Sequence, residues 1–481
     1  MQSIIHYIVL STATFSLFYA FLRFKGRKYA IEKIRGPPSP SSLFGLSPWR
    51  LLRSRQHLGD LEMDWYQTYG AVYRTKGCFG QDILDVNRIN GAATGQGLIF
   101  ATGEIHQRQR RILGPAFTAS QLRLFLNVFQ ASAVKLTEQI NERVDNAKVL
   151  NMLEWTSKAA LDIIGITSFR YEFNSLSGGQ TELMAALNNL LDVAMKVSRP
   201  IFEKQLKEVA NDVNPAEKDV VNVLALAHLN DDAKKKMDDT EIDSQLATFV
   251  LAGHDTTANT MAWLLYELSL HPEDQAKIRG EISQAKSNAP GALTSNDYDS
   301  MLWLNACIKE TLRLHPLAHC LFREPAQDDI LPLSEPVIIS DGKSCSQIPI
   351  PKGQIVLASI YTYNRFWGDD AEKWNPNRFL DGRDTKQTSL GVYANLLTFS
   401  AGIRGCVGWR FAVMELQSVV TELLSNFEFS MPKGVSRLQH SPAGIALIPI
   451  VPGKAEEGAQ IPLLVTELNK WMDGFGSRNN L

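Results

Sequence analysis

The feature that most constrains this chain is a glycine-rich loop that holds a cysteine just before a predicted helix. The loop covers Phe399–Gly408 and reads FSAGIRGCVG, and a helical pattern begins at Arg410. Its three glycines allow a tight turn and the close approach of a flat ligand. The free N–H groups and positive dipole at a helix N-terminus favour thiolate, as does the nearby cation of Arg404. Cys406 is therefore predicted to be a metal ligand. The alternative is a buried structural cysteine in a turn.

Composition and missing motifs narrow the chemistry further. The 481 residues include 49 Lys and Arg against 51 Asp and Glu, so nothing favours phosphate binding and no nucleic-acid partner is expected. Five scattered cysteines, none in a CxxC, argue against a disulfide scaffold or a zinc site. The sequence contains no GxxxxGK[ST] and no strand-linked GxGxxG, which are the usual phosphate-binding motifs. Any redox chemistry here therefore needs electrons from another protein.

The N-terminal segment predicts a membrane anchor. Residues Ile4–Leu22 contain no Asp, Glu, Lys or Arg, and their length of 19 residues is about enough to span a bilayer as a helix. Positive residues follow the apolar run, which places the rest of the chain in the cytosol. A cleaved signal peptide is the alternative, but its charges would precede the run. Residues 23–48 form a basic connector whose prolines between Gly36 and Ser42 make it stiff and extended.

Hydrophobic periodicity predicts a mainly α chain with small β-sheets. We expect one catalytic domain over residues 49–469 and a disordered tail over 470–481. Short β-branched runs predict strands, and the Pro-, Gly- and Asp-rich stretch Ile330–Asn395 predicts ordered loop. The predicted strands are Gly70–Arg74 and Gln354–Ser359, and the predicted helices are Ser120–Val144, Leu153–Ser168, Thr181–Val197, Ser244–Leu270, Pro272–Lys286, Tyr298–Leu314 and Arg410–Asn426.

With this loop at its centre, the sequence resembles a cytochrome P450, a haem-thiolate monooxygenase, from the anchor to about Val465. The loop matches the family spacing FxxGxRxCxG. The resemblance implies the cytochrome P450 fold behind one transmembrane helix, with a b-type haem whose iron is ligated by the Cys406 thiolate. Phe399, Gly402 and Arg404 would belong to the cofactor-binding loop.

A second matching motif is Ala252-Gly253-His254-Asp255-Thr256-Thr257, within a long helical stretch. In the family this helix crosses the distal face of the haem, and local unwinding lets a hydroxyl and an acid point inward. The resemblance makes Asp255 and Thr256 the catalytic pair: Thr256 would hydrogen-bond dioxygen and Asp255 would help to deliver protons. The small Ala252-Gly253 pair would leave room for dioxygen. The alternative is a solvated polar patch on a helix.

A third match concerns structural support. Glu310 and Arg313 stand three positions apart, so they share a helix face, and Pro316 then ends the helix. Alone, such a pair is a common surface ion pair of little worth. The resemblance implies a buried triad with Arg378 of the Pro376–Phe379 segment, which would support the haem loop.

Three more residues are predicted to hold the haem propionates. His106 and Arg110 lie four positions apart, so both can reach one propionate. The family most often has Trp where this chain has His106, although His can also donate to a carboxylate. Arg323 matches a third propionate-binding position. The alternative for Arg110 and Arg323 is ordinary solvation.

The resemblance implies oxidation of a small lipophilic substrate with O2 and electrons from NADPH. The electrons would come through NADPH–cytochrome P450 reductase, with cytochrome b5 as a second donor, at the endoplasmic reticulum membrane. The chain is most similar to fungal members of secondary metabolism, with terpenoids as the expected substrates. One alternative is an oxygen-independent haem-thiolate isomerase or dehydratase, relatives of which usually lack the Asp-Thr pair.

Two segments are shorter than the family norm, between Val86 and Gly95 and between Pro200 and Asp219. Both regions shape substrate access in the family. Either the pocket is trimmed and open, or coding segments are missing from the sequence. An inactive haem-binding remnant is therefore the other alternative.

Overall fold

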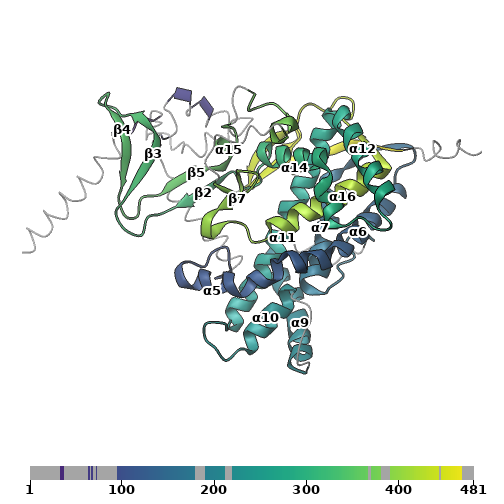
Figure 1. Cartoon of the computed structure of the whole chain (residues 1–481), viewed down its shortest axis with the longest axis horizontal. Helices are drawn as coiled ribbons and strands as arrows, with labels where there is room; N and C mark the ends of the chain where they lie inside the picture. Colours follow the sequence, from purple (N-terminus) through teal and green to yellow (C-terminus); the bar gives the residue numbers. More distant parts are fainter. Residues whose placement is uncertain are drawn as a thin grey trace, which may run out of the picture. The chain divides into compact units, whose positions relative to one another are not determined.

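A computed structural model describes residues 33–36, 63–64, 67–68, 72, 95–178, 190–211, 219–366, 370–380, 390–443 and 446–468 (Figure 1). The predicted anchor, most of the connector, the tail and most of the strand predicted over Gly70–Arg74 lie outside these ranges. None of the helices within them combines the length and apolar character needed to cross a membrane.

The chain divides into two compact units. The smaller contains residues 1–84 and 320–362, and the larger contains residues 85–319 and 363–481. In the smaller unit, strand β2 (Cys320–Arg323) pairs antiparallel with β5 (Val356–Ser359), and β3 (Asp329–Ile338) pairs antiparallel with β4 (Ser344–Ile350). A small core of Ile34, Val337 and Ile348 packs on the second pair.

The β3–β4 pair corrects the prediction of loop over this region. Three prolines lie in its strands: Pro332, Pro336 and Pro349. Because proline is typical of loops, their presence favoured the prediction of loop. Proline is tolerated in an edge strand, where no donor is lost from a ladder. A two-stranded ribbon consists of two edge strands. A proline whose ring nitrogen points away from the partner strand therefore removes no hydrogen bond between them.

The larger unit is mostly helical. Its helices are α5 (Gly103–Leu113), α6 (Ala119–Asn141), α7 (Met152–Phe169), α9 (Leu190–Asn211), α10 (Val220–Leu229), α11 (Asp239–Leu270), α12 (Pro272–Asn288), α13 (Ser295–Ser300), α14 (Leu302–Leu314) and α16 (Trp409–Asn426). The short helix α15 (Ile360–Tyr363) spans the point in the sequence where the smaller unit ends and the larger unit resumes. Its strands are β1 (Ala147–Asn151), β6 (Gly391–Tyr393), β7 (Leu396–Ala401), β8 (Phe427–Ser430), β9 (Gln439–Ala443), β10 (Ala446–Ile450) and β11 (Pro462–Glu467).

Where they fall on described residues, the predicted helices agree with these elements except in three places; residues 181–189 of one predicted helix lie outside the described ranges. Helix α9 continues through Pro200, although a proline usually ends a helix. The predicted helix over Tyr298–Leu314 is two helices, which meet at Met301. Helix α11 begins at Asp239 rather than Ser244, because Asp238 and Glu241 form a capping box at its start.

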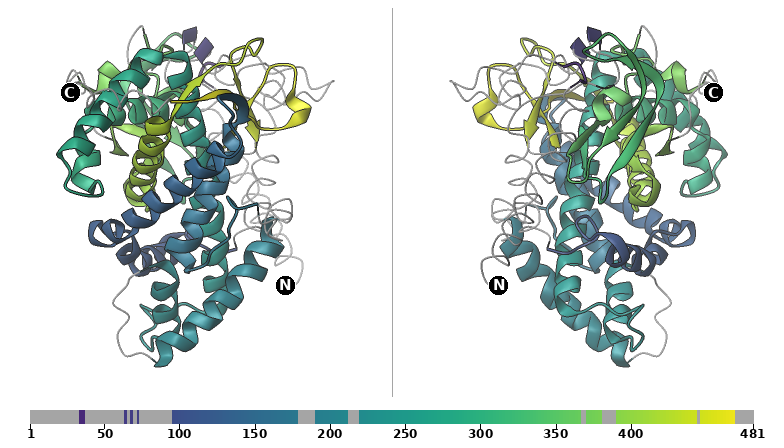
Figure 2. Two further views of the ribbon diagram at one scale, coloured as in Figure 1. Left: turned by 90° about the vertical axis from the view of Figure 1, so that its right-hand side faces the viewer. Right: turned by 90° about the vertical axis from the view of Figure 1, so that its left-hand side faces the viewer.

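Helix α11 is the centre of the larger unit. It packs against α7, α9, α14 and α16 and is buried along most of its length (Figure 1). Sheet β1–β11–β8 joins the early and the late parts of the chain, so strands coloured blue and yellow lie side by side (Figure 2). The cysteine loop, the Asp255–Thr256 pair and the Glu310–Arg313 pair thus all lie in the larger unit.

Candidate active site

The cysteine loop is held between a β-hairpin and the start of α16. Strands β6 and β7 are joined by Ala394 and Asn395, both with positive φ, as a tight two-residue hairpin requires. The chain then turns, and the Cys406 N–H donates to the Phe399 carbonyl at 2.8 Å. Because α16 begins at Trp409, the predicted position of Cys406 before a helix N-terminus is confirmed.

Two glycines of the loop are needed for different reasons. Gly402 has φ +62°, which lies in the left-handed region that L residues rarely adopt. Gly405 has an ordinary φ, but a Cβ there would lie only 2.6 Å from Cγ1 of Val392 on β6. The loop therefore depends on conformational freedom at one glycine and on a close approach to the hairpin at the other.

The Cys406 side chain is exposed, yet protein surrounds it closely enough that desolvation is the main influence on its acidity. Burial raises the pKa of the thiol, while the Gly408 backbone N–H and the cation of Arg110 lower the pKa by smaller amounts. The helix terminus therefore favours thiolate, as predicted, and the cation that also favours it is Arg110 rather than the predicted Arg404, but burial outweighs both. A metal ion can supply the missing stabilisation, since a coordinated thiol is deprotonated.

Helix α5 brings His106 and Arg110 to the same region. His106 is buried, and its pKa is lowered first by desolvation and then by the cations of Arg404 and Arg110. Arg110 is half-buried, and neither its guanidinium nor the His106 ring has a hydrogen-bond or ion-pair partner among the described residues. A half-buried cation beside an imidazole donor fits a carboxylate ligand. Together with the thiol, these residues fit a haem with its propionates.

Arg404 joins the cysteine loop to the segment before α5. Its guanidinium donates to the backbone carbonyls of Leu98 and Ile99, each at 3.4 Å, and to that of Ala101. This side chain therefore holds the segment before α5 against the cysteine loop. Arg323 lies on β2 of the smaller unit, where it donates to the Phe322 carbonyl at 2.8 Å.

Asp255 and Thr256 lie on α11, which stays a regular helix through them, so the predicted local unwinding is absent. The Thr256 hydroxyl donates to the Ala252 carbonyl at 2.8 Å and is exposed, and the Asp255 side chain is 49% exposed. A Cβ on Gly253 would lie 2.6 Å from Cδ1 of Ile164 on α7. A side chain at Gly253 would therefore meet Ile164 where the two helices approach.

The three charged residues Glu310, Arg313 and Arg378 meet as predicted. Glu310 accepts two hydrogen bonds from Arg313, at 2.7 and 2.8 Å, and one from Arg378 at 3.1 Å. Glu310 and Arg313 are fully buried, and Arg378 is 2% exposed. The alternative of a surface ion pair is therefore excluded.

A hydrogen-bond path connects this triad to the cysteine loop. Arg313 donates to the Asn364 carbonyl at 3.3 Å, and the Asn364 side chain donates to the Thr398 hydroxyl at 2.7 Å. The Leu397 N–H in turn donates to the Asn364 side chain at 3.0 Å. Thr398 and Leu397 belong to β7, which leads directly into the loop. The triad thus braces the strand that positions Cys406.

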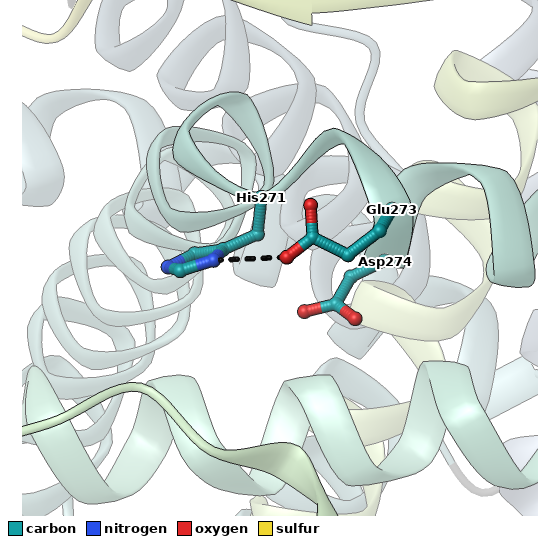
Figure 3. A group of neighbouring side chains, drawn as sticks. All are labelled: His271, Glu273 and Asp274. Atoms are coloured by element: carbon teal, nitrogen blue, oxygen red, sulfur yellow. Dashed lines mark hydrogen bonds and ion pairs between the residues drawn. The ribbon is translucent and has the colours of Figure 1, made fainter.

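One cluster outside these motifs was missed by sequence reasoning. His271, Glu273 and Asp274 lie where α11 meets α12, and their side chains form the sole trio of metal-ligand type in the described part of the chain (Figure 3). Both Asp274 oxygens accept from indole N–H groups, of Trp303 at 3.1 Å and Trp374 at 2.8 Å. Asp274 therefore serves as a structural anchor for two tryptophans.

Backbone strain in the loop gives a testable prediction. Ser400 has φ +58°, although it is not a glycine, whereas Gly402 at φ +62° has no atom within 4 Å of the Cβ that alanine would add. Ser400→Gly should raise the free energy of unfolding by about 0.5–1 kcal/mol, and Gly402→Ala should lower it by about 1–2 kcal/mol. Denaturant unfolding of both variants measures this. Shifts of the same sign would contradict it.

Comparisons with known proteins agree with this geometry. The family model described as Cytochrome P450 matches residues 66–203 and 193–455. Cytochrome P450 monooxygenase 81 of Postia placenta (strain ATCC 44394 / Madison 698-R) is 30% identical, over 93% of this chain and 95% of the relative. Cytochrome P450 monooxygenase claQ of Ampulloclitocybe clavipes is 28% identical, over 92% and 94%. A crystal structure of a cytochrome P450 (CYP102L1) has a TM-score of 0.64 and 22% identity, over 80% of this chain and 84% of that one.

The same comparisons bear on the short segments. The alignment with monooxygenase 81 spans 536 positions, whereas this chain has 481 residues, so at least 55 positions have no counterpart here. The two family matches also meet around residues 193–203, next to one of the two segments that the sequence marks as short.

Proposed function

This chain belongs to the cytochrome P450 family, and from that premise we propose that Cys406 ligates the iron of its haem. The protein is a cytochrome P450 monooxygenase, an enzyme with a cysteine-ligated haem that uses O2, a small substrate and a redox partner. Four cysteines are described: Cys307 and Cys320 are buried, and Cys345 lies on β4. Cys406 is exposed just before the start of α16. It lies near Arg110, whose guanidinium has no partner among the described residues, and this observation carries the proposal.

Residues around Cys406 have separate tasks in this proposal. His106 and Arg110 would bind a haem propionate, since their donors have no partner among the described residues, and the sequence resemblance makes Arg323 a third candidate. Arg404 would hold the loop and the Leu98–Ala101 segment together through backbone carbonyls. When bound, haem supplies the activation of O2 and the oxidation of the substrate. The protein contributes position, proton supply and exclusion of water.

Asp255 and Thr256 would provide the proton supply. The Thr256 hydroxyl can leave the Ala252 carbonyl to hydrogen-bond dioxygen, and the exposed Asp255 carboxylate can exchange protons with solvent. Such proton transfer by a positioned side chain typically contributes 10²–10⁴-fold to a rate, by order of magnitude. Both residues lie on one regular helix, which sets the position of their backbone and leaves their side chains able to turn.

The electron source, location and substrate class belong to the same proposal. Electrons would come from NADPH through NADPH–cytochrome P450 reductase, with cytochrome b5 as a second donor, because the sequence has no flavin or nicotinamide motif of its own. The apolar segment Ile4–Leu22 supports a single-pass anchor in the endoplasmic reticulum membrane, with the catalytic part in the cytosol. A lipophilic substrate of fungal secondary metabolism, with terpenoids first, rests on the likeness to fungal monooxygenases.

One observation favours a second candidate, a haem-binding protein without turnover. At least 55 positions of a full-length relative are missing here, which leaves less chain to enclose a substrate. An isomerase or dehydratase that needs no O2 is a weaker alternative, since Asp255 and Thr256 are both present.

The ferrous–CO difference spectrum, followed by turnover with NADPH and a supplied reductase, separates these candidates. A strongly red-shifted Soret band with NADPH-dependent product supports the monooxygenase. The same band without product over a panel of terpenoids and other lipophilic substrates supports the inactive protein. A band typical of imidazole or neutral-thiol ligation would contradict the assignment of Cys406.

Thr256→Ala tests the distal pair. We expect product per NADPH to fall about tenfold or more, while substrate binding and the CO spectrum stay unchanged, because only proton supply is removed. Thr256→Ser should restore most of the coupling. Thr260→Ala is the matched control, since Thr260 makes the same kind of bond to its own helix, at 2.9 Å to the Thr256 carbonyl. Equal coupling in the Thr256→Ala and Thr260→Ala variants would argue against the role.

Deletion of residues Met1–Leu22 tests the anchor. We expect the shortened protein to move from the membrane fraction to the soluble fraction and to keep its CO spectrum, because the described contacts of the cysteine loop all lie in the larger unit. Fractionation with and without carbonate washing measures the change. Tight membrane binding after the deletion would show that other surfaces hold the protein there.

A further inference from the structure

Helices α7 and α11 are locked together beside the proposed catalytic pair. Gly253 of α11 accommodates Ile164 of α7, and the Thr156 hydroxyl donates across the interface to the Ala258 carbonyl at 2.9 Å. Between these two contacts, the Ser157 hydroxyl lies 3.0 Å from Nε2 of His254. The interface therefore holds the His254 imidazole in a defined place.

The other ring nitrogen of His254 faces Asp255. Nδ1 lies 3.2 Å from Oδ1 of Asp255, a close contact that a rotation of the carboxylate would turn into a hydrogen bond. Neighbouring residues on a helix project about 100° apart, so the Asp255 carboxylate must turn back toward the imidazole to make this approach. The His254 side chain is 5% exposed and that of Asp255 is 49% exposed, so a fixed imidazole is the neighbour of a carboxylate that can rotate.

The two contacts of His254 select one tautomer. Burial lowers the pKa of His254, so its imidazole is neutral near pH 7 and has one donor and one acceptor nitrogen. An ionised carboxylate can only accept, so Nδ1 is the nitrogen that carries the proton toward Asp255. Nε2 is then the acceptor, and the Ser157 hydroxyl is the group that can donate to it.

We infer that His254 is a positioning residue for Asp255 and that Ser157 fixes the tautomer in which it acts. The imidazole holds Oδ1 of the carboxylate, which leaves Oδ2 free to take up a proton from solvent and pass it on beside Thr256. This inference rests on the proposed role of Asp255 and adds two residues to it, one of them on a different helix. Outer-shell partners that orient a functional group typically contribute about 10–100-fold.

Four variants test the inference in the full-length enzyme with its reductase. His254→Ala should lower product per NADPH about tenfold. His254→Asn should recover most of the coupling, because its amide N–H can replace Nδ1–H as a donor to Asp255. Ser157→Ala should give an intermediate loss, since Nε2 loses the partner that fixes the tautomer. Thr167→Val is the control, because Thr167 is also a buried hydroxyl on α7 but donates only to the Ile163 carbonyl of its own helix.

The readouts separate positioning from a purely structural effect. Coupling and the solvent isotope effect on product formation should change, whereas KM, the CO spectrum and the unfolding midpoint should stay the same in the Asn and Ser157→Ala variants. Unchanged coupling in Ser157→Ala, or no recovery by Asn relative to Ala, would overturn the inference.

Asp255→Asn separates a failure of the positioning role of His254 from a failure of the proposed role of Asp255. If Asp255→Asn uncouples the enzyme but the His254 and Ser157 variants do not, the inference about His254 fails and the role of Asp255 survives. If Asp255→Asn itself remains coupled, the proposed role of the acid fails, and the positioning role fails with it.

Discussion

Cys406→Ser is expected to abolish the thiolate-type CO spectrum and to remove monooxygenase turnover. Serine has no comparable ligand for iron, and the thiolate is the group that favours O–O cleavage in haem enzymes. Loss of a metal's outer-shell partner alone typically costs about 10–100-fold, so loss of the ligand itself should reduce turnover by more than about 100-fold. Difference spectroscopy and product analysis measure both effects.

The matched control for this variant is Cys345→Ser. Cys345 lies on β4 of the smaller unit, where its thiol donates to the Gln347 carbonyl at 2.9 Å, and a serine hydroxyl can make the same bond. We expect its spectrum and turnover to match those of the unaltered enzyme. A normal thiolate spectrum in Cys406→Ser would refute the ligand assignment. The ligand would then be one of the other cysteines.

Glu310→Gln should have the second largest effect, this time on stability. The change leaves the fully buried guanidinium of Arg313 without its carboxylate, and Arg378 keeps only Asp370 at 3.2 Å. Removing one partner of a buried ion pair typically costs about 3–5 kcal/mol, because the remaining charge has neither water nor a counter-ion. Denaturant unfolding and haem content of the purified protein measure the result.

Glu154→Gln is the matched control for the triad. Glu154 also pairs with a cation on its own helix, Lys158 at 2.6 Å, but its side chain is 54% exposed. Solvent screening limits such a pair to about 0–1 kcal/mol. Similar losses in the free energy of unfolding of the two variants would mean that burial does not increase the contribution of the triad to stability. Since Asn364 connects the triad to β7, we also expect Glu310→Gln to lower haem content, and Glu154→Gln to leave it unchanged.

The two predictions test different parts of one arrangement. Cys406 supplies the ligand, and the buried triad holds the strand that presents it. The ligand variant should fail in spectrum and turnover with little change in stability, whereas the triad variant should fail in stability first. A protein that kept its spectrum but gave no product would point to the region of substrate access rather than to the haem site.

Local rules in the sequence were enough to determine the cysteine loop and its helix. Glycine spacing and a helical pattern act over a few neighbouring residues, so the turn at Gly402 and the start of α16 follow from them. The i, i+3 spacing of Glu310 and Arg313 likewise predicts their meeting on one face. That Arg378 completes the triad came from resemblance alone, because it lies 68 residues from Glu310.

Tertiary packing decided the rest. Gly253 proved to be a contact with Ile164, Arg404 found backbone carbonyls far away in sequence, and Ser157 came to face His254 across two helices. Periodicity shows which face of a helix is apolar but not which neighbour will cover it, and burial then sets whether a charge is held or solvated. Local sequence patterns thus set the chemistry available at the loop, because they act over a few neighbouring residues, while the packing of distant segments set which side chains support it.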